Sequence, residues 1–162
     1  YYLTKNYREA YKLFACSGIL FNHESPRRNI NFVSRKITKN LSLIIKGKLK
    51  KIILGNINSK RDWGHAKDYV YAMWKILQLK RPQDFVIGTG KVHSVRDFLH
   101  LAFKRANLDY KKYIKIDKRL FRPNDNIILK ANFNKAKRIL NWKPKISFKS
   151  LVNEMVDYDL NN

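Results

Sequence analysis

The stretch ACSGILFNHESPRRN, residues 15–29, changes abruptly from an apolar run to a polar segment. Its apolar part, residues 15–21, does not alternate with polar residues, which is typical of a buried strand in a parallel sheet. The polar part, residues 22–31, crowds together amide, imidazole, carboxylate and guanidinium groups, and we expect it to be a loop. Because loops after parallel strands hold the ligands of α/β proteins, the stretch predicts a binding site.

Helical and strand-like segments alternate along the rest of the chain. Helical periodicity predicts helices at residues 1–14, 32–47, 68–79, 95–107, 134–140 and 147–160. Short apolar runs predict strands at residues 52–54, 85–87 and 113–117. Gly47 and Ser94 suit helix C-terminal and N-terminal caps, respectively. The helix at residues 68–79 is strongly amphipathic, with Val70, Met73, Trp74 and Leu77 on its apolar side, the side that normally faces a core. This alternation predicts an α/β protein with a partly parallel sheet.

The composition allows one ordinary core, since 44% of the 162 residues are hydrophobic. The formal net charge of +23 would suit a polyanionic partner such as nucleic acid. However, the lysines are spread over every segment, and the sequence offers no recognition helix or RNA-binding aromatic motif. A basic nucleic-acid-binding module is therefore only an alternative, and we expect no nucleic-acid partner.

Cysteine and histidine usage limits the chemistry. The single cysteine, Cys16, excludes an intramolecular disulfide and suits a buried thiol in a reducing compartment. The four histidines have no metal-ligand spacing, so no metal site is expected. No apolar run approaches the roughly 20 residues that span a bilayer, and no signal peptide is visible. We expect a cytoplasmic protein without membrane contact.

Three predicted loops should meet at one rim of the sheet, and each contains arginine: residues 22–29, 55–68 and 122–126. Guanidinium groups bind phosphate oxygens in a planar, two-pronged manner, so this rim suits a diphosphate linkage. From the residues alone, two interpretations of His23 and the arginines are equally good. They could bind a ligand, or they could be solvated charges and groups that form hydrogen bonds within their own loops. For Asp62 and Asp68, turn bonding and helix capping are the better interpretation. No GxGxxG turn is present to hold a dinucleotide.

Several motifs together carry a family resemblance: FNHESPRR (21–28), FVSRKIT (32–38), RDWGHAKDYV (61–70), DFVIGTG (84–90), FRPND (121–125) and NWKPK (141–145). From Tyr1 to about Asp159 the chain resembles the GDP-mannose 4,6-dehydratases, which are extended short-chain dehydrogenases/reductases. The resemblance implies the C-terminal part of a Rossmann-like NAD(P)-binding enzyme with its small substrate-binding domain. Related sugar-nucleotide epimerases and reductases share shorter elements and are the alternative within the enzyme class.

The resemblance also implies a division of the chain. Its last Rossmann-like elements would occupy about residues 1–21 and 52–90, and the sugar-nucleotide-binding domain about residues 22–51 and 91–162. In this family the catalytic YxxxK motif, its assisting Thr and Glu, and the glycine-rich NADP loop precede the position of Tyr1. We therefore expect a C-terminal portion of a longer protein that is inactive by itself.

The family's reaction converts GDP-mannose into GDP-4-dehydro-6-deoxy-mannose and water, with NADP taking a hydride from C4 and returning it to C6. The product serves GDP-fucose and other deoxyhexose biosynthesis. By resemblance, the NADP contacts are His23 and Arg28, and the substrate contacts are Asn22, Val33, Lys36, Arg61, Arg122 and Asp125. Asp125 stands where the family usually has Glu. The Arg27/Arg28 loop implies packing against a neighbouring subunit, hence a homo-oligomer, either a dimer or a tetramer.

Overall fold

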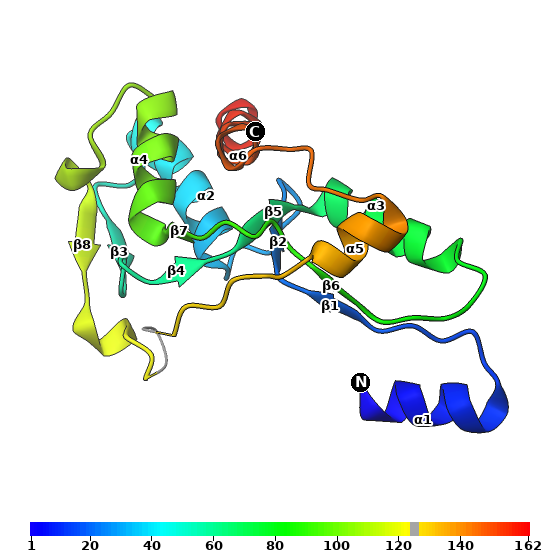
Figure 1. Cartoon of the computed structure of the whole chain (residues 1–162). Helices are drawn as coiled ribbons and strands as arrows, with labels where there is room; N and C mark the ends of the chain where they lie inside the picture. Colours follow the sequence, from blue (N-terminus) through cyan, green and yellow to red (C-terminus); the bar gives the residue numbers. More distant parts are fainter. Residues whose placement is uncertain (124–126) are drawn as a thin grey trace.

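The computed structural model describes residues 1–123 and 127–162, so the predicted site residue Asp125 lies outside the described part. Its helices and strands form an extended assembly, with α2 (Val33–Ile45), α4 (Val95–Arg105) and α6 (Phe148–Asn161) at one end and α1 (Tyr2–Tyr11) at the other (Figure 1). Asn22, His23 and Arg61 of the predicted site lie on strands, and its other described residues lie at the start of a helix or in loops.

Short strand pairs form the sheet structure, and three of the four pairs among the described residues are parallel. The parallel pairs are β1 (Gly18–Leu20) with β6 (Phe85–Ile87), β2 (Asn22–Glu24) with β5 (Trp63–His65), and β3 (Ile52–Leu54) with β8 (Ile114–Ile116). The antiparallel pair is β4 (Lys60–Arg61) with β7 (His93–Ser94). These pairs confirm the prediction of an α/β protein with partly parallel strands.

The helices confirm the predicted helical segments to within a few residues. They are α1 (Tyr2–Tyr11), α2 (Val33–Ile45), α3 (Ala66–Leu77), α4 (Val95–Arg105), α5 (Asn134–Leu140) and α6 (Phe148–Asn161), with short 3-10 turns η1 (Tyr110–Lys112) and η2 (Lys118–Leu120). Ser94 caps α4 through a capping box with Asp97, as its position predicted. Gly47, with φ of 69°, follows α2, where Lys48 N–H donates to the Leu43 carbonyl as in a Schellman motif.

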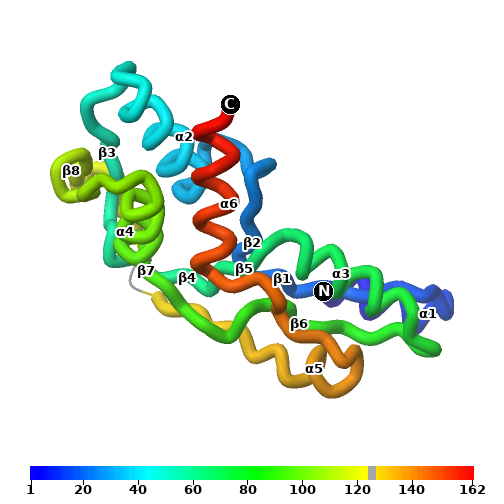
Figure 2. The backbone as a smooth tube through the Cα atoms, turned by 90° about the horizontal axis from the view of Figure 1, so that it is seen from above, coloured from blue at the N-terminus to red at the C-terminus, as the bar shows by residue number. Residues whose placement is uncertain are grey.

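Two clusters of buried side chains form the core. The larger one lies among α2, α4 and α6, which contact one another (Figure 2), and includes Leu41, Phe98 and Leu151. The second lies between α3, α5 and β6 and includes Tyr69 and Trp142. The two-part domain division expected from the sequence stays a prediction.

Three expectations about local structure were wrong. Residues 22–24 and 60–65, expected to be loop, contain strands, because their backbones pair with segments far along the chain. Ile19 of β1 is 47% exposed, so this strand is not buried as predicted. The apolar side of α3 that carries Val70 and Trp74 is exposed, and the helix instead buries the side with Tyr69 and Ala72. Cys16 is half-buried.

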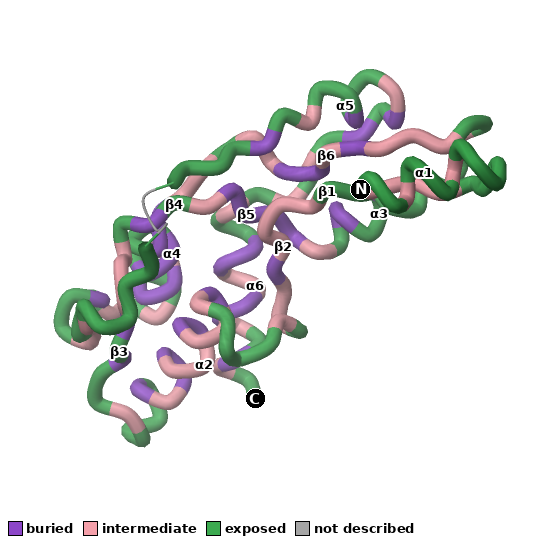
Figure 3. The backbone as a smooth tube through the Cα atoms, turned by 90° about the horizontal axis from the view of Figure 1, so that it is seen from below, coloured by how far each residue is buried: buried purple, intermediate pink, exposed green. Residues whose placement is uncertain are grey.

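Helix α1 contributes no buried residue (Figure 3) and is attached through an ion pair. The Arg8 guanidinium donates to both carboxylate oxygens of Asp84 at 2.9 Å and to the Ala15 carbonyl at 3.0 Å. The Ser17 N–H also donates to Asp84 at 2.6 Å. One carboxylate therefore ties α1 to the start of β1 and to the segment before β6.

This ion pair predicts a loss of stability in acid. The hydrogen bond from Arg8 is the main cause that lowers the pKa of Asp84 from 3.8 to about 2. A carboxyl group with a lowered folded-state pKa stabilises the fold above its unfolded pKa, and this contribution is lost as the pH falls from 3.8 towards 2. After allowance for solvent screening we expect a loss of about 1 kcal/mol. Urea unfolding at several pH values would measure it, and Asp84→Asn should abolish this part of the pH dependence.

In the described part of the chain, no helix combines the length and the apolar composition needed to cross a bilayer.

Candidate functional site

A cavity of about 680 Å³ lies where β2, the start of α2 and the segment from β3 to β5 meet. Its wall includes five of the six residues predicted to contact the substrate: Asn22, Val33, Lys36, Arg61 and Arg122. The sixth, Asp125, is outside the described residues. The three loops expected at one rim thus meet, although they follow strands of different small sheets.

A second cavity of about 690 Å³ is lined by the two predicted cofactor contacts, His23 and Arg28. Its other walls are mostly apolar and include Leu20, Phe21 and Leu129. Asn22 and Arg61 line this cavity as well as the first one. The structure therefore places the predicted cofactor and substrate residues that it describes around two adjoining cavities.

Strand β2 distributes its side chains between the two cavities. Successive residues of a strand point to opposite faces, and accordingly His23 lines the second cavity whereas Glu24 lines the first. The register of β2 against β5 pairs His23 with Gly64. The His23 Nδ1 lies 2.9 Å from the Phe21 carbonyl oxygen. Because a carbonyl only accepts, Nδ1 carries the proton, and Nε2 of a neutral ring is left as an acceptor.

Arg28 is held on two sides. Its guanidinium carbon lies 3.5 Å from the centre of the Phe32 ring, in a cation–π contact. Its Nε is 3.2 Å from a carboxylate oxygen of Glu24, a residue that is 2% exposed. The same Glu24 oxygen accepts a hydrogen bond of 2.6 Å from the Ser34 hydroxyl. Burial is the main cause that raises the pKa of Glu24, and the Ser34 hydrogen bond and Arg28 oppose it.

Asp62, next to Arg61, organises the backbone between the cavities. It is 1% exposed and accepts hydrogen bonds from the Thr89 N–H (2.8 Å), the Thr89 hydroxyl (2.6 Å), the Gly90 N–H (2.9 Å) and the Ala131 N–H (3.0 Å). The structural interpretation of Asp62 from the sequence is thus confirmed, although its partners are distant in the chain rather than local. Asp62 fixes the place from which Arg61 reaches both cavities.

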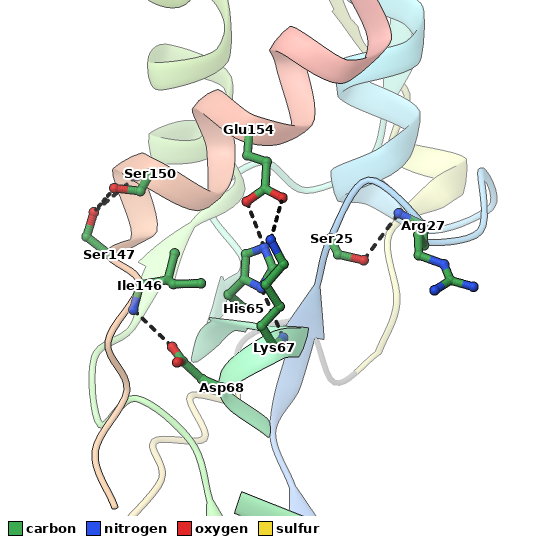
Figure 4. A network of polar contacts seen from close by, with 9 residues as sticks. All are labelled: Ser25, Arg27, His65, Lys67, Asp68, Ile146, Ser147, Ser150 and Glu154. Carbon is green, nitrogen blue, oxygen red and sulfur yellow. Dashed lines mark hydrogen bonds and ion pairs between the residues drawn. The ribbon is translucent and has the colours of Figure 1, made fainter. Parts of the chain in front are cut away.

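The beginning of α3 is fixed by a second polar network (Figure 4). The His65 ring accepts a hydrogen bond from the Lys67 N–H at 3.0 Å, and its Nε2 lies 2.9 Å from a carboxylate oxygen of Glu154 on α6. Asp68 accepts from the N–H groups of Lys145 and Ile146 at 2.9 and 3.0 Å. Both aspartates of the RDWGHAKD segment are therefore structural, as the sequence favoured.

A further cavity, of about 770 Å³, lies beside the first turns of α4 and α6 and contains none of the predicted site residues. Its wall includes His93, which stacks on Phe148 with ring centres 3.9 Å apart. Desolvation is the main cause that lowers the pKa of His93. Within residues 1–123 and 127–162, no group of three or more metal-ligating side chains is present.

Sequence reasoning missed two groups that support the site. The sequence pattern assigns no role to Glu24 and places Ser34 only within a predicted helix. The alternation of Asn22, His23 and Glu24 across a strand would have revealed Glu24, but the run was too short and too polar to identify as a strand.

Comparison with known proteins identifies the family. The sequence model of the family described as GDP-mannose 4,6 dehydratase matches residues 1–155. GDP-mannose 4,6 dehydratase 1 of Arabidopsis thaliana is 53% identical over 160 residues, covering 99% of this chain and 44% of that protein. The GDP-mannose 4,6 dehydratase of Homo sapiens is 47% identical over 177 residues, covering 99% of this chain and 48% of that protein. The chain thus spans about half the length of these relatives.

Solved structures show the same fold at low sequence identity. RMD from Pseudomonas aeruginosa, complexed with NADPH, superposes with a TM-score of 0.87 at 16% identity, covering 99% of this chain and 53% of that one. dTDP-glucose 4,6-dehydratase from Bacillus anthracis, in complex with NAD, gives a TM-score of 0.81 at 20% identity and covers 99% and 49%. The fold is that of Rossmann-like extended short-chain dehydrogenases, and the chain belongs to the GDP-mannose 4,6-dehydratase family.

Proposed function

We propose that this chain is the substrate-binding part of a GDP-mannose 4,6-dehydratase, a hydro-lyase that forms GDP-4-dehydro-6-deoxy-mannose and water from GDP-mannose. The observation that carries the proposal is the first cavity, whose wall combines Asn22, Lys36, Arg61 and Arg122. Guanidinium and ammonium groups suit the diphosphate, and the Asn22 amide suits a sugar hydroxyl. Val33 would contact the apolar faces of the ligand, and Asp125 would contact the guanine base.

The second cavity fits part of a nicotinamide dinucleotide, which we propose is NADP. Apolar walls suit flat rings, and Arg28 and Arg61 provide donors for phosphate oxygens, whereas the His23 Nε2 can accept a hydrogen bond from a cofactor hydroxyl. When bound, the nicotinamide would supply hydride acceptance and return. The contribution of this chain is to bind and orient, since the catalytic Tyr and Lys of the family match none of its residues. We therefore expect no dehydratase turnover from the 162-residue chain alone.

Assembly and location are part of the proposal. The loop with Arg27 also exposes Ile30 (48%) and Phe32 (46%), an apolar pair that suits contact with a neighbouring subunit of a homo-oligomer. The proposed division separates Rossmann-like elements (about 1–21 and 52–90) from the sugar-nucleotide domain (about 22–51 and 91–162). A cytoplasmic location would suit the free thiol of Cys16.

Titration of the chain with GDP tests the substrate site directly. We expect Arg61→Ala to raise the Kd for GDP about tenfold, because a charge-assisted hydrogen bond to a phosphate is lost. The matched control is Arg105→Ala, which removes an arginine paired with Asp157 on the surface and absent from both site cavities. Isothermal calorimetry measures both variants. Equal GDP affinities for Arg61→Ala and the unchanged chain would contradict the assignment of the first cavity.

A further inference from the structure

We propose that Glu24 is a positioning residue, which holds the Arg28 guanidinium in the wall of the second cavity. The inference deepens the proposed function, because it rests on Arg28 as a cofactor contact. Among the described residues, Glu24 is the carboxylate paired with Arg28, at 3.2 Å. The Glu24 side chain is 3% exposed, whereas that of Arg28 is 22% exposed and reaches the second cavity.

The geometry separates the groups that anchor the guanidinium from those that can bind a ligand. The Phe32 ring covers one face of the guanidinium, and Glu24 lies beside Nε. This Nε is buried and has no hydrogen-bond partner, so the Glu24 contact acts as a charge pair rather than as an aligned hydrogen bond. Within the described residues, Glu24 pairs with Nε rather than with the two terminal nitrogens of Arg28, which leaves these nitrogens for phosphate oxygens in the second cavity.

Glu24 is itself fixed in a way that suits this role. The Ser34 hydroxyl, in the first turn of α2, donates to the same carboxylate oxygen that faces Arg28. Glu24 is therefore attached to β2 by its backbone and to α2 by its side chain. An ionised carboxylate this deeply buried has a high desolvation free energy when no cation is nearby. The charge of Arg28 offsets this free energy as long as the guanidinium stays beside Glu24. Burial and pairing thus favour one placement of the arginine.

Arginine side-chain NMR of the 162-residue chain tests the positioning without any ligand. We expect the Arg28 Nε–H signal to be ordered and slow to exchange in the unchanged chain and in Ser34→Ala, which keeps the charge pair. In Glu24→Gln, which is isosteric and can still bond to Ser34, the signal should broaden or exchange faster. Glu154→Gln, which removes a carboxylate from the His65 network, is the control and should leave Arg28 unchanged. An unchanged Arg28 signal in Glu24→Gln overturns the proposal.

Titration with NADPH, followed on the same NMR signals, tests whether the position of Arg28 matters for cofactor binding. We expect Glu24→Gln to raise the Kd for NADPH about tenfold, with thermal unfolding confirming that the variant folds. If Glu24 acts through Arg28, Glu24→Gln should have no further effect in an Arg28→Ala background, whereas additive losses would overturn the proposal. The Arg28 signal could depend on Glu24 and yet not respond to NADPH. That result would support the positioning role of Glu24 and contradict the proposed role of Arg28 as a cofactor contact.

Discussion

Asp62→Ala is expected to lower the free energy of unfolding by about 4 kcal/mol, because it removes one buried carboxylate that satisfies several donors at once. The substitution leaves the N–H groups of Thr89, Gly90 and Ala131 without their acceptor, a carboxylate on a residue that is 1% exposed. Urea unfolding followed by circular dichroism measures the change.

Asp157→Asn is the matched control for Asp62. Its carboxylate pairs with Arg105 at 2.8 Å, but the two side chains are 41% and 49% exposed. Exposed pairs of this kind contribute about 0.2–1 kcal/mol. A loss below about 1 kcal/mol for Asp62→Ala, similar to that of the control, would contradict the claim that the Asp62 hydrogen bonds stabilise the backbone between the two cavities.

Gly64→Ala is expected to destabilise the chain by about 2 kcal/mol through overpacking. A Cβ at this position would lie 2.4 Å from Cε2 and 2.9 Å from the hydroxyl oxygen of Tyr69. Tyr69 is fully buried and its ring lies 5.1 Å from that of His23, so it has little room to move. We also expect weaker NADPH binding, since His23 lies in the strand that pairs with Gly64.

Gly47→Ala separates the effect of space from the effect of conformation. At Gly47 a Cβ would meet nothing within 4 Å, but φ is +69°. This variant should cost about 1 kcal/mol through backbone strain alone and leave NADPH binding unchanged. Thermal unfolding and NADPH titration of both variants separate the two effects. Equal NADPH affinities for Gly64→Ala and Gly47→Ala would contradict the expectation that overpacking at Gly64 disturbs the second cavity.

The long helices and the apolar strands could be predicted from the sequence, because their periodicity and caps are local signals. Ser94 and Gly47 mark helix ends, and the buried face of α6 follows helical spacing. Strands β2 and β4 could not be predicted, since partners tens of residues away in sequence stabilise these short polar segments. The exposed side of α3 misled the prediction, because apolar residues at helical spacing do not reveal which side is buried.

The candidate site was predicted in part by the residues and in part by family resemblance. Arginine-rich loops after predicted strands indicated a shared rim, and the structure places Arg61 and Arg122 in one cavity wall. Residue chemistry alone gave His23 and Arg28 no separate role; only the resemblance assigned them to the cofactor. The supporting pair, Glu24 and Ser34, depends on the contact between β2 and α2, which no local pattern encodes.

Arg61 and Asn22 line both site cavities, and this makes the two occupancies thermodynamically linked. An anion in one cavity would partly neutralise the Arg61 guanidinium and occupy some of its N–H donors. The binding free energy of an anion in the other cavity would therefore change. By reciprocity, the factor by which the first ligand alters the affinity of the second equals the factor in the opposite direction. For the proposed ligands we therefore expect the affinity measured for either one in isolation to differ from its affinity when both cavities are filled.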